Sequence, residues 1–266
     1  MKRTLSILGL ASIALLSVDL IVKIVQKIIP KKKESDMILA EKLNQELLKT
    51  PSFALESARF AIIEMSEFTL SMYNASIDYF NKKDEKVYDF INSTEEKVDL
   101  AEHSIHDYLM QISGTRMNQN DMILQTAYID IIRDMERIAD HAVNFGEFLH
   151  RYYDEKNIMT NEMHDALLKF FEVVKLQIIE SIDAYKNNDK VLASKVILRE
   201  NEVDKMEEEY RLNVHSFLKT GEVSQLDILF IDIVSNLERI SDHTMNIAEL
   251  IIDPHMMSTM ITGEKI

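Results

Sequence analysis

A fifteen-residue polar pattern occurs twice in this chain and strongly constrains its fold. Residues 130–144 read DIIRDMERIADHAVN, and residues 232–246 read DIVSNLERISDHTMN, at an offset of 102 positions. Matches between 77–99 and 182–204 keep a different offset, of 105 positions. Self-similarity at such a period predicts one structural unit present twice in tandem. The change in offset indicates a small difference in loop length between the two copies.

Each copy is predicted to be helical, because apolar residues recur at spacings of three and four through most of the chain. The chain has only 5 Gly and 3 Pro, which favours long uninterrupted elements. Pro51 suits a first helical turn, and Asp84 and Asp189 suit N-caps. No segment has a convincing strand pattern. We predict helices at 36–49, 52–80, 84–113, 120–153, 160–187, 189–219 and 224–252.

The N-terminal segment, residues 1–35, has a different pattern. An apolar run from Leu5 to Val22 has basic residues on both sides, and five lysines follow it within 23–33. A helix of this length would extend about 27 Å, close to the thickness of the hydrocarbon core of a bilayer. We predict a single span in the inner membrane, with the remainder cytoplasmic because the lysines are concentrated on that side. An interfacial helix on a peripheral cytoplasmic protein and a cleaved signal peptide remain alternatives.

The composition of the chain excludes several classes of function. The formal net charge of −15 argues against nucleic-acid binding, which needs clustered Lys and Arg, and suits cations or basic partner surfaces. The chain has no cysteine, so thiolate metal sites and cysteine nucleophiles are excluded. Any bound metal must therefore be held by oxygen or imidazole ligands.

Paired carboxylates are the candidate site. Glu and Asp four residues apart share a helix face, where like charges repel. The chain has six Glu-x-x-x-Asp pairs, and all except Glu85/Asp89 and Glu249/Asp253 occupy equivalent positions in the two copies. A solvated face with an Arg–Asp lattice would explain them without a ligand. Alternatively, two carboxylates from each of two helices would hold one or two cations per copy, with His141 and His243 as ligands or supporting donors.

The segments Glu136-Arg-Ile-Ala-Asp-His-Ala and Glu238-Arg-Ile-Ser-Asp-His-Thr resemble the duplicated Glu-Arg-Ile-Gly-Asp-His-Ala signature of the PhoU family. Ala139 and Ser241 replace the glycine, and both are small enough for close helix approach. The segment from Pro51, which follows a hydrophobic and then a basic stretch, is similar to the cytoplasmic tail of bacterial sodium/phosphate cotransporters. Unlike those transporters, this chain has at most one predicted span.

The resemblance implies an all-α fold of two tandem three-helix bundles, here preceded by the hydrophobic N-terminal helix. The expected domains are the anchor at 1–35, a linker helix with the first unit at 36–153, the second unit at 154–253 and a flexible tail at 254–266. It also implies multinuclear sites for divalent or trivalent metal ions (iron, zinc, manganese or magnesium). The metal ligands it implies are Glu95, Asp99, Glu136, Asp140, Glu200, Asp204, Glu238 and Asp242, with Asp130 and Asp232 behind them.

The function expected from this resemblance is regulatory. We expect a membrane-associated, metal-binding regulator or accessory subunit of inorganic phosphate transport or phosphate signalling, and not an enzyme. Its partner would be a phosphate transporter or a sensor kinase, and the chain could also form a homodimer. One alternative is a helical interaction module that binds no metal and docks on a basic partner. A di-metal enzyme in a helical bundle is a further alternative, but it needs inward-facing carboxylates.

Overall fold

The computed structural model describes residues 43–112, 116–154, 159–218 and 225–255. Six long helices account for most of these residues, and no strand occurs among them, so the predicted all-α class is confirmed. The described elements are η1 (Gln45–Lys49), α3 (Pro51–Lys82), α4 (Glu85–Gln111), α5 (Gln119–Asp154), α6 (Asn161–Asn187), α7 (Lys190–Leu218) and α8 (Gln225–Ile252).

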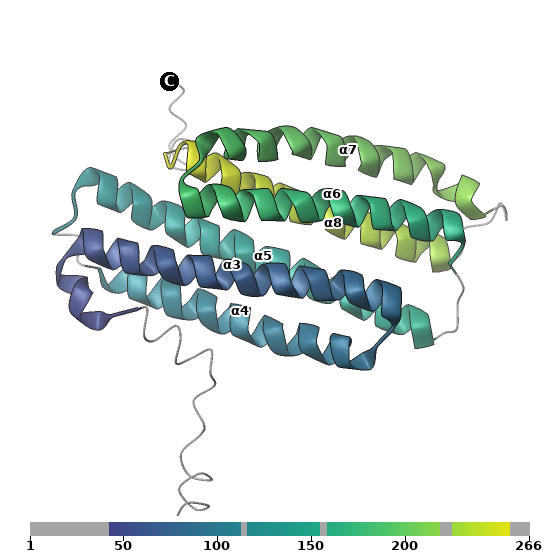
Figure 1. Ribbon diagram of the computed structural model, residues 1–266, viewed down its shortest axis with the longest axis horizontal. Coiled ribbons are helices and arrows are strands. Elements are labelled where there is room, and N and C mark those ends of the chain that lie inside the picture. The colour runs from purple at the N-terminus through teal and green to yellow at the C-terminus, as the bar shows by residue number, and fades with distance from the viewer. Residues whose placement is uncertain (1–42, 113–115, 155–158, 219–224, 256–266) are drawn as a thin grey trace, which may run out of the picture. The chain divides into compact units, whose positions relative to one another are not determined.

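The six long helices form two sets of three that correspond to the two copies in the sequence. Helix α3 packs against α4 and α5 in the first set, and α8 packs against α6 and α7 in the second. The sets meet mainly through α5 and α8, with a smaller contact between α3 and α6 (Figure 1). The two helices that carry the Glu-Arg-Ile-x-Asp-His motif therefore lie side by side.

Local signals in the sequence determine where these helices begin. Pro51 occupies the first turn of α3. Asp84 accepts a hydrogen bond from the backbone N–H of Lys86 at the start of α4, and Asp189 does the same for Val191 at the start of α7. The predicted helix 36–49 differs from the structure. Of this segment, 36–42 lies outside the described residues, and only the 3₁₀ turn of η1 forms in the rest.

The predicted membrane location is corrected. Among the helices described between residues 45 and 252, none is sufficiently long and apolar to cross a bilayer. The hydrophobic segment 1–35 on which the prediction rested lies outside the described residues, as does the tail beyond residue 255. The described fold thus gives no support to a single-span inner-membrane protein or to membrane contact through an N-terminal helix, and we withdraw that prediction.

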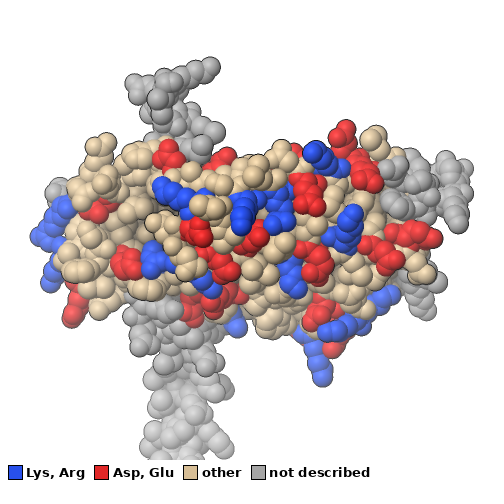
Figure 2. Space-filling view, turned by 45° about the horizontal axis from the view of Figure 1, so that its top comes forward, with Lys and Arg blue, Asp and Glu red and all other residues tan. Residues whose placement is uncertain are grey.

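One face of the molecule carries charged residues of both signs (Figure 2). Figure 2 shows Lys and Arg interspersed with Asp and Glu on the face that it presents. On this face the acidic residues are therefore separated by basic ones and do not form one continuous negative patch.

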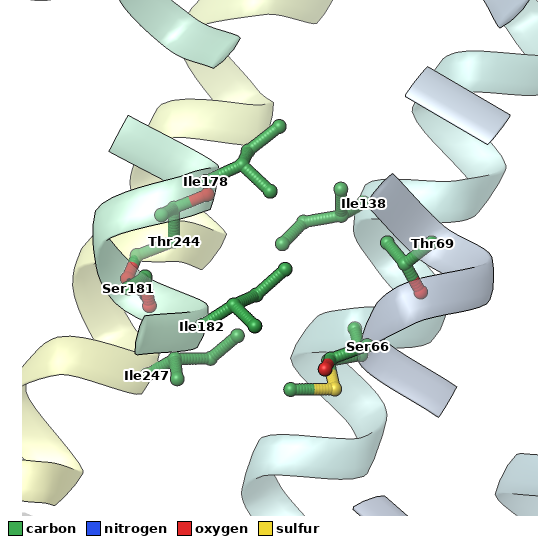
Figure 3. A pocket seen from close by; sticks show the side chains of 9 residues that line it. Ser66, Thr69, Ile138, Ile178, Ser181, Ile182, Thr244 and Ile247 are labelled. Carbon is green, nitrogen blue, oxygen red and sulfur yellow. Dashed lines mark hydrogen bonds between the residues drawn. The ribbon is translucent and has the colours of Figure 1, made fainter. Parts of the chain in front are cut away.

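The interior between the two sets is closely packed. Ser66 and Thr69 of α3 lie across from Ile178 and Ile182 of α6, around a cavity of about 10 Å³ (Figure 3). A cavity of this size has room for about one water molecule. The interface between the sets therefore offers no space for a larger ligand at this point, and the candidate site must lie elsewhere.

Candidate metal centre

The first carboxylate cluster consists of Glu95 and Asp99 on α4 and Glu136 and Asp140 on α5. These helices are neighbours in the first set, as the repeated pattern predicted. All four side chains are partly buried, whereas the apolar residues beside them, including Val98 and Ile138, form the core. The cluster thus lies at the edge of the core and is open to solvent.

The carboxylates of this cluster destabilise one another's charged forms. The pKa of Glu136 is raised to about 7, first by burial, then by the charge of Asp140, with a smaller contribution from Asp99. Burial also raises the pKa of Glu95, together with the charges of Asp99 and Asp140. The guanidinium of Arg137 opposes this effect, at 3.6 Å from an oxygen of Glu136 and 3.6 Å from one of Asp140.

The second carboxylate cluster consists of Glu200 and Asp204 on α7 and Glu238 and Asp242 on α8. The pKa of Glu200 is raised to about 7, first by burial and then by its neighbour Asp204. The pKa of Glu238 is likewise raised to about 7, first by burial and then by the charges of Asp242, Glu207 and Asp204. The same electrostatic arrangement therefore occurs in both copies.

The two clusters fit a cation by charge, but not by a preformed coordination sphere. No group of three or more His, Asp or Glu side chains converges on a point that could hold a metal ion within the described ranges. Coordination would require carboxylate side chains to change rotamer. Asp204 is exposed and therefore able to move. Surface carboxylates that rearrange in this way are hard oxygen ligands, which divalent and trivalent cations accept.

The two remaining candidate ligands have other contacts. Asp130 accepts a hydrogen bond from Arg133 at 3.1 Å, and burial raises its pKa while Arg133 lowers it. The backbone carbonyl of Asp232 accepts a hydrogen bond from the Asn236 side chain at 2.8 Å. The Asp130 carboxylate is therefore paired within α5, whereas the Asp232 contact involves only its backbone.

Sequence reasoning did not foresee the polar contacts between α5 and α8. His243 Nδ1 lies 2.8 Å from Oδ1 of the buried Asp134, and His141 Nδ1 lies 2.9 Å from Oδ1 of Asn236. The two imidazole rings are stacked, with centroids 5.7 Å apart. Asp134 and Asn236 are equivalent in the two copies, as are the two histidines. These contacts become visible only when one copy packs against the other. In the sequence, the one available indication was that the four residues form two equivalent pairs at the offset of 102.

Comparisons with known proteins support this architecture. A family model described as the PhoU domain matches residues 62–149 and 167–251. A phosphate-specific transport system accessory protein PhoU homolog from Xylella fastidiosa is 28% identical over 220 residues, which cover 79% of this chain and 88% of the relative. A protein of the same name from Clostridium acetobutylicum is 27% identical over 220 residues, covering 80% of this chain and 94% of the relative.

Solved structures show the same fold. The crystal structure of PhoU from Pseudomonas aeruginosa has a TM-score of 0.68 at 20% identity and covers 79% of this chain and 98% of its own. A phosphate transport system regulatory protein PhoU from Streptococcus pneumoniae has a TM-score of 0.69 at 14% identity, covering 82% of this chain and 99% of its own. With the family match to both copies and the duplicated motif on adjacent helices, the chain belongs to the PhoU family.

Proposed function

We propose that this chain is an accessory regulator of inorganic phosphate transport. The proposal is supported by the relatives, which are named phosphate-specific transport system accessory proteins and align with most of this chain. A regulator of this kind would act by contacting a phosphate transporter or a sensor kinase. No catalytic step is needed for this role.

We further propose that the two carboxylate clusters bind divalent or trivalent cations, with iron, zinc, manganese and magnesium as the candidates. The observation that carries this part is the position of paired carboxylates on two neighbouring helices of each copy, where burial and mutual repulsion raise the pKa of Glu136, Glu200 and Glu238 to about 7. A cation between the facing helices would remove the repulsion that produces part of these shifts. The Glu and Asp oxygens would supply the ligands, and Arg137 would hold two of them in place in the first cluster.

Metal content tests cation binding directly. The full chain, purified without chelator, should contain metal at a constant molar ratio. The double variant Glu136→Gln/Asp140→Asn should lose the share held by the first cluster and keep that of the second. Glu85→Gln/Asp89→Asn is a matched control, because this pair has the same spacing and charge but lies outside both clusters. Absence of stoichiometric metal in the wild-type chain would refute this part of the proposal.

Phosphate uptake by cells tests the regulatory role separately. Deletion of the gene should alter phosphate uptake or phosphate-dependent gene expression, and the intact gene should restore it. If the cluster variants also restore it, the regulator does not depend on its cations. If deletion changes neither readout, the regulatory proposal fails whether or not metal binds.

One observation favours a second function, in which the clusters dock on a basic protein segment without metal. No described group of ligands is preassembled around a cation position, and the clusters are accessible at the surface. This function predicts partner binding that weakens steeply with salt and persists in chelator. Pull-down of the partner in the presence and absence of chelator distinguishes the two functions.

A further inference from the structure

A hollow of about 270 Å³ lies where α3 and α5 end and α6 begins, in a part of the fold that the carboxylate clusters do not use. Its volume is close to the lower limit for small-molecule sites. Three different helices and the segment before α6 contribute to its wall. The residues that line it are Phe80, Asn81, Lys83, Tyr152, Tyr153, Met159, Asn161 and His164.

The lining is cationic and aromatic, in a chain whose net charge is −15. The ammonium of Lys83 lies over the ring of Tyr153, 4.3 Å from its centroid. The imidazole of His164 stacks on Phe80 with a centroid distance of 4.7 Å. No Asp or Glu belongs to the wall in the described part of the chain. The described side chains that line the hollow are therefore neutral or positive.

The start of α6 adds backbone donors to this wall. Asn161 is the first residue of the helix, and the Thr160 hydroxyl caps only the N–H of Met163. The first N–H groups of a helix have no acceptor within the helix, and the helix dipole makes this end attractive to anions. A group bound beside Asn161 would meet these donors and the Lys83 ammonium together.

A buried hydroxyl provides an independent indication of a ligand. Tyr152 lines the hollow and is only 6% exposed, yet its hydroxyl has no hydrogen-bond partner among the residues that the structure describes. Burial raises the pKa of this hydroxyl, and the backbone of Met159 partly opposes the shift. Unsatisfied buried hydroxyls are rare because each costs about 1–3 kcal/mol. A bound acceptor in the hollow would satisfy this donor.

A second, larger hollow gives a useful contrast. It has a volume of about 440 Å³ and also contains two cations, Arg59 and Lys186. Both are already paired there, because Glu56 accepts two hydrogen bonds from Nε and one from Nη2 of Arg59, and Glu67 lies 2.9 Å from Lys186. No ion pair of Lys83 occurs among the described residues. The smaller hollow thus has the stronger preference for an anion.

From this combination we propose that the hollow between the ends of α3 and α5 and the start of α6 binds a small oxyanion, as inorganic phosphate or as the phosphoryl group of an organic ester. Lys83 and the α6 amides bind its oxygens, and Tyr152 donates the hydrogen bond that it lacks in the free protein. The aromatic walls accommodate the organic part of an ester. This site is independent of the carboxylate clusters and of the cations proposed for them.

Lys83 provides a clean variant, because its equivalent in the second copy is Asn188. Both residues end a helix in the left-handed conformation, at φ 55° and φ 50°. Asn adopts this conformation more readily than Lys, so Lys83→Asn should fold at least as well as the wild type. Lys82→Asn is the matched control, since Lys82 carries the same charge one position earlier but pairs with Asp78 and does not line the hollow.

Calorimetric titration of the full chain in EDTA and low salt tests the site, with chloride at equal ionic strength as reference. Inorganic phosphate and phenyl phosphate should bind saturably, and the tighter of the two identifies the source of the oxyanion. Lys83→Asn should weaken binding about tenfold or more, as expected for the loss of a charged hydrogen bond. Lys82→Asn should leave binding unchanged. Because EDTA removes metals, the result does not depend on cation binding by the clusters.

Tyr152→Phe provides a second test that does not alter charge. It should weaken oxyanion binding while leaving the stability of the ligand-free protein equal to or above that of the wild type. Absence of saturable binding by the wild type overturns the proposal. Equal loss of binding in Lys82→Asn and Lys83→Asn also overturns it, because general surface charge would then explain the effect.

Discussion

Two residues at the centre of the second set show how the copies have diverged. Ser241, which replaces the signature glycine, is fully buried and donates a hydrogen bond of 2.7 Å to Gln177 on α6. The Gln177 amide in turn donates to the backbone carbonyl of Val196 on α7 at 3.4 Å. The first copy has Ala139 and Met72 at the two equivalent positions, both buried. One copy therefore uses a polar pair where the other uses an apolar one.

Ser241→Ala should destabilise the chain by about 1–3 kcal/mol, because it leaves the buried Gln177 carbonyl without its donor. The double variant Ser241→Ala/Gln177→Met reproduces the residues of the first copy and should recover most of this loss. Urea denaturation of the two variants and the wild type measures both effects. Equal stability of the single and double variants would show that the hydrogen bond has no net role.

At the scale of the helices, the features best predicted from the sequence are those determined by residues close together in the chain. The helix starts at Pro51, Asp84 and Asp189 were anticipated because capping and turn preferences act within a few residues. The pairing of α4 with α5, and of α7 with α8, followed from the matched register of the Glu-x-x-x-Asp pairs. The described part of the predicted helix 36–49, residues 43–49, contains only a 3₁₀ turn, since helix-favouring residues form a long helix only where tertiary packing supports it.

Features assembled from distant segments could not be predicted in this way. The hollow beside Lys83 combines the ends of two helices with the start of a third, and no local pattern marks it. The contact between His243 and Asp134 joins residues that are 109 positions apart. Both depend on how α5 and α6 pack against the other copy. Spacing along one helix contains no information about that packing.

The N-cap of α7 offers a test of the local rules. The Asp189 carboxylate accepts hydrogen bonds from the backbone N–H groups of Val191 and Leu192, both at 3.0 Å. Asp189→Ala should therefore lower the free energy of unfolding by about 1 kcal/mol, and Asp189→Asn should retain most of it. Chemical denaturation measures the difference. An alanine variant as stable as the wild type would mean that water replaces this cap without loss.

At the scale of the whole molecule, the two copies are linked by a pair of similar but unequal polar contacts. In one, His243 meets the buried carboxylate of Asp134, which also accepts a hydrogen bond from Asn246 at 3.4 Å. In the other, His141 meets the neutral amide of Asn236. Each histidine directly follows an aspartate of a carboxylate cluster. Each carboxylate cluster is therefore adjacent in sequence to a histidine of the contact between the copies.

The clusters of both copies should affect stability in the same direction as pH changes. The pKa of Glu136, Glu200 and Glu238 rises from 4.5 to about 7 on folding. Between these values the folded chain binds more protons than the unfolded chain, so the free energy of unfolding falls as pH rises. This contribution is fully present below pH 4.5 and is lost as pH rises through about 7. The lowered pKa of His141 acts in the opposite direction.

A comparison with a triple variant isolates the glutamates from that opposing effect. In EDTA, the stability of the wild type relative to Glu136→Gln/Glu200→Gln/Glu238→Gln should decrease steadily from pH 4.5 to 7 and remain constant above it. Urea denaturation at several pH values measures this difference, and Glu85→Gln, which removes a carboxylate outside both clusters, serves as the control. A bound cation should flatten the wild-type curve, because it favours the ionised carboxylates. A relative stability independent of pH would show that the clusters are too well solvated for their charges to repel.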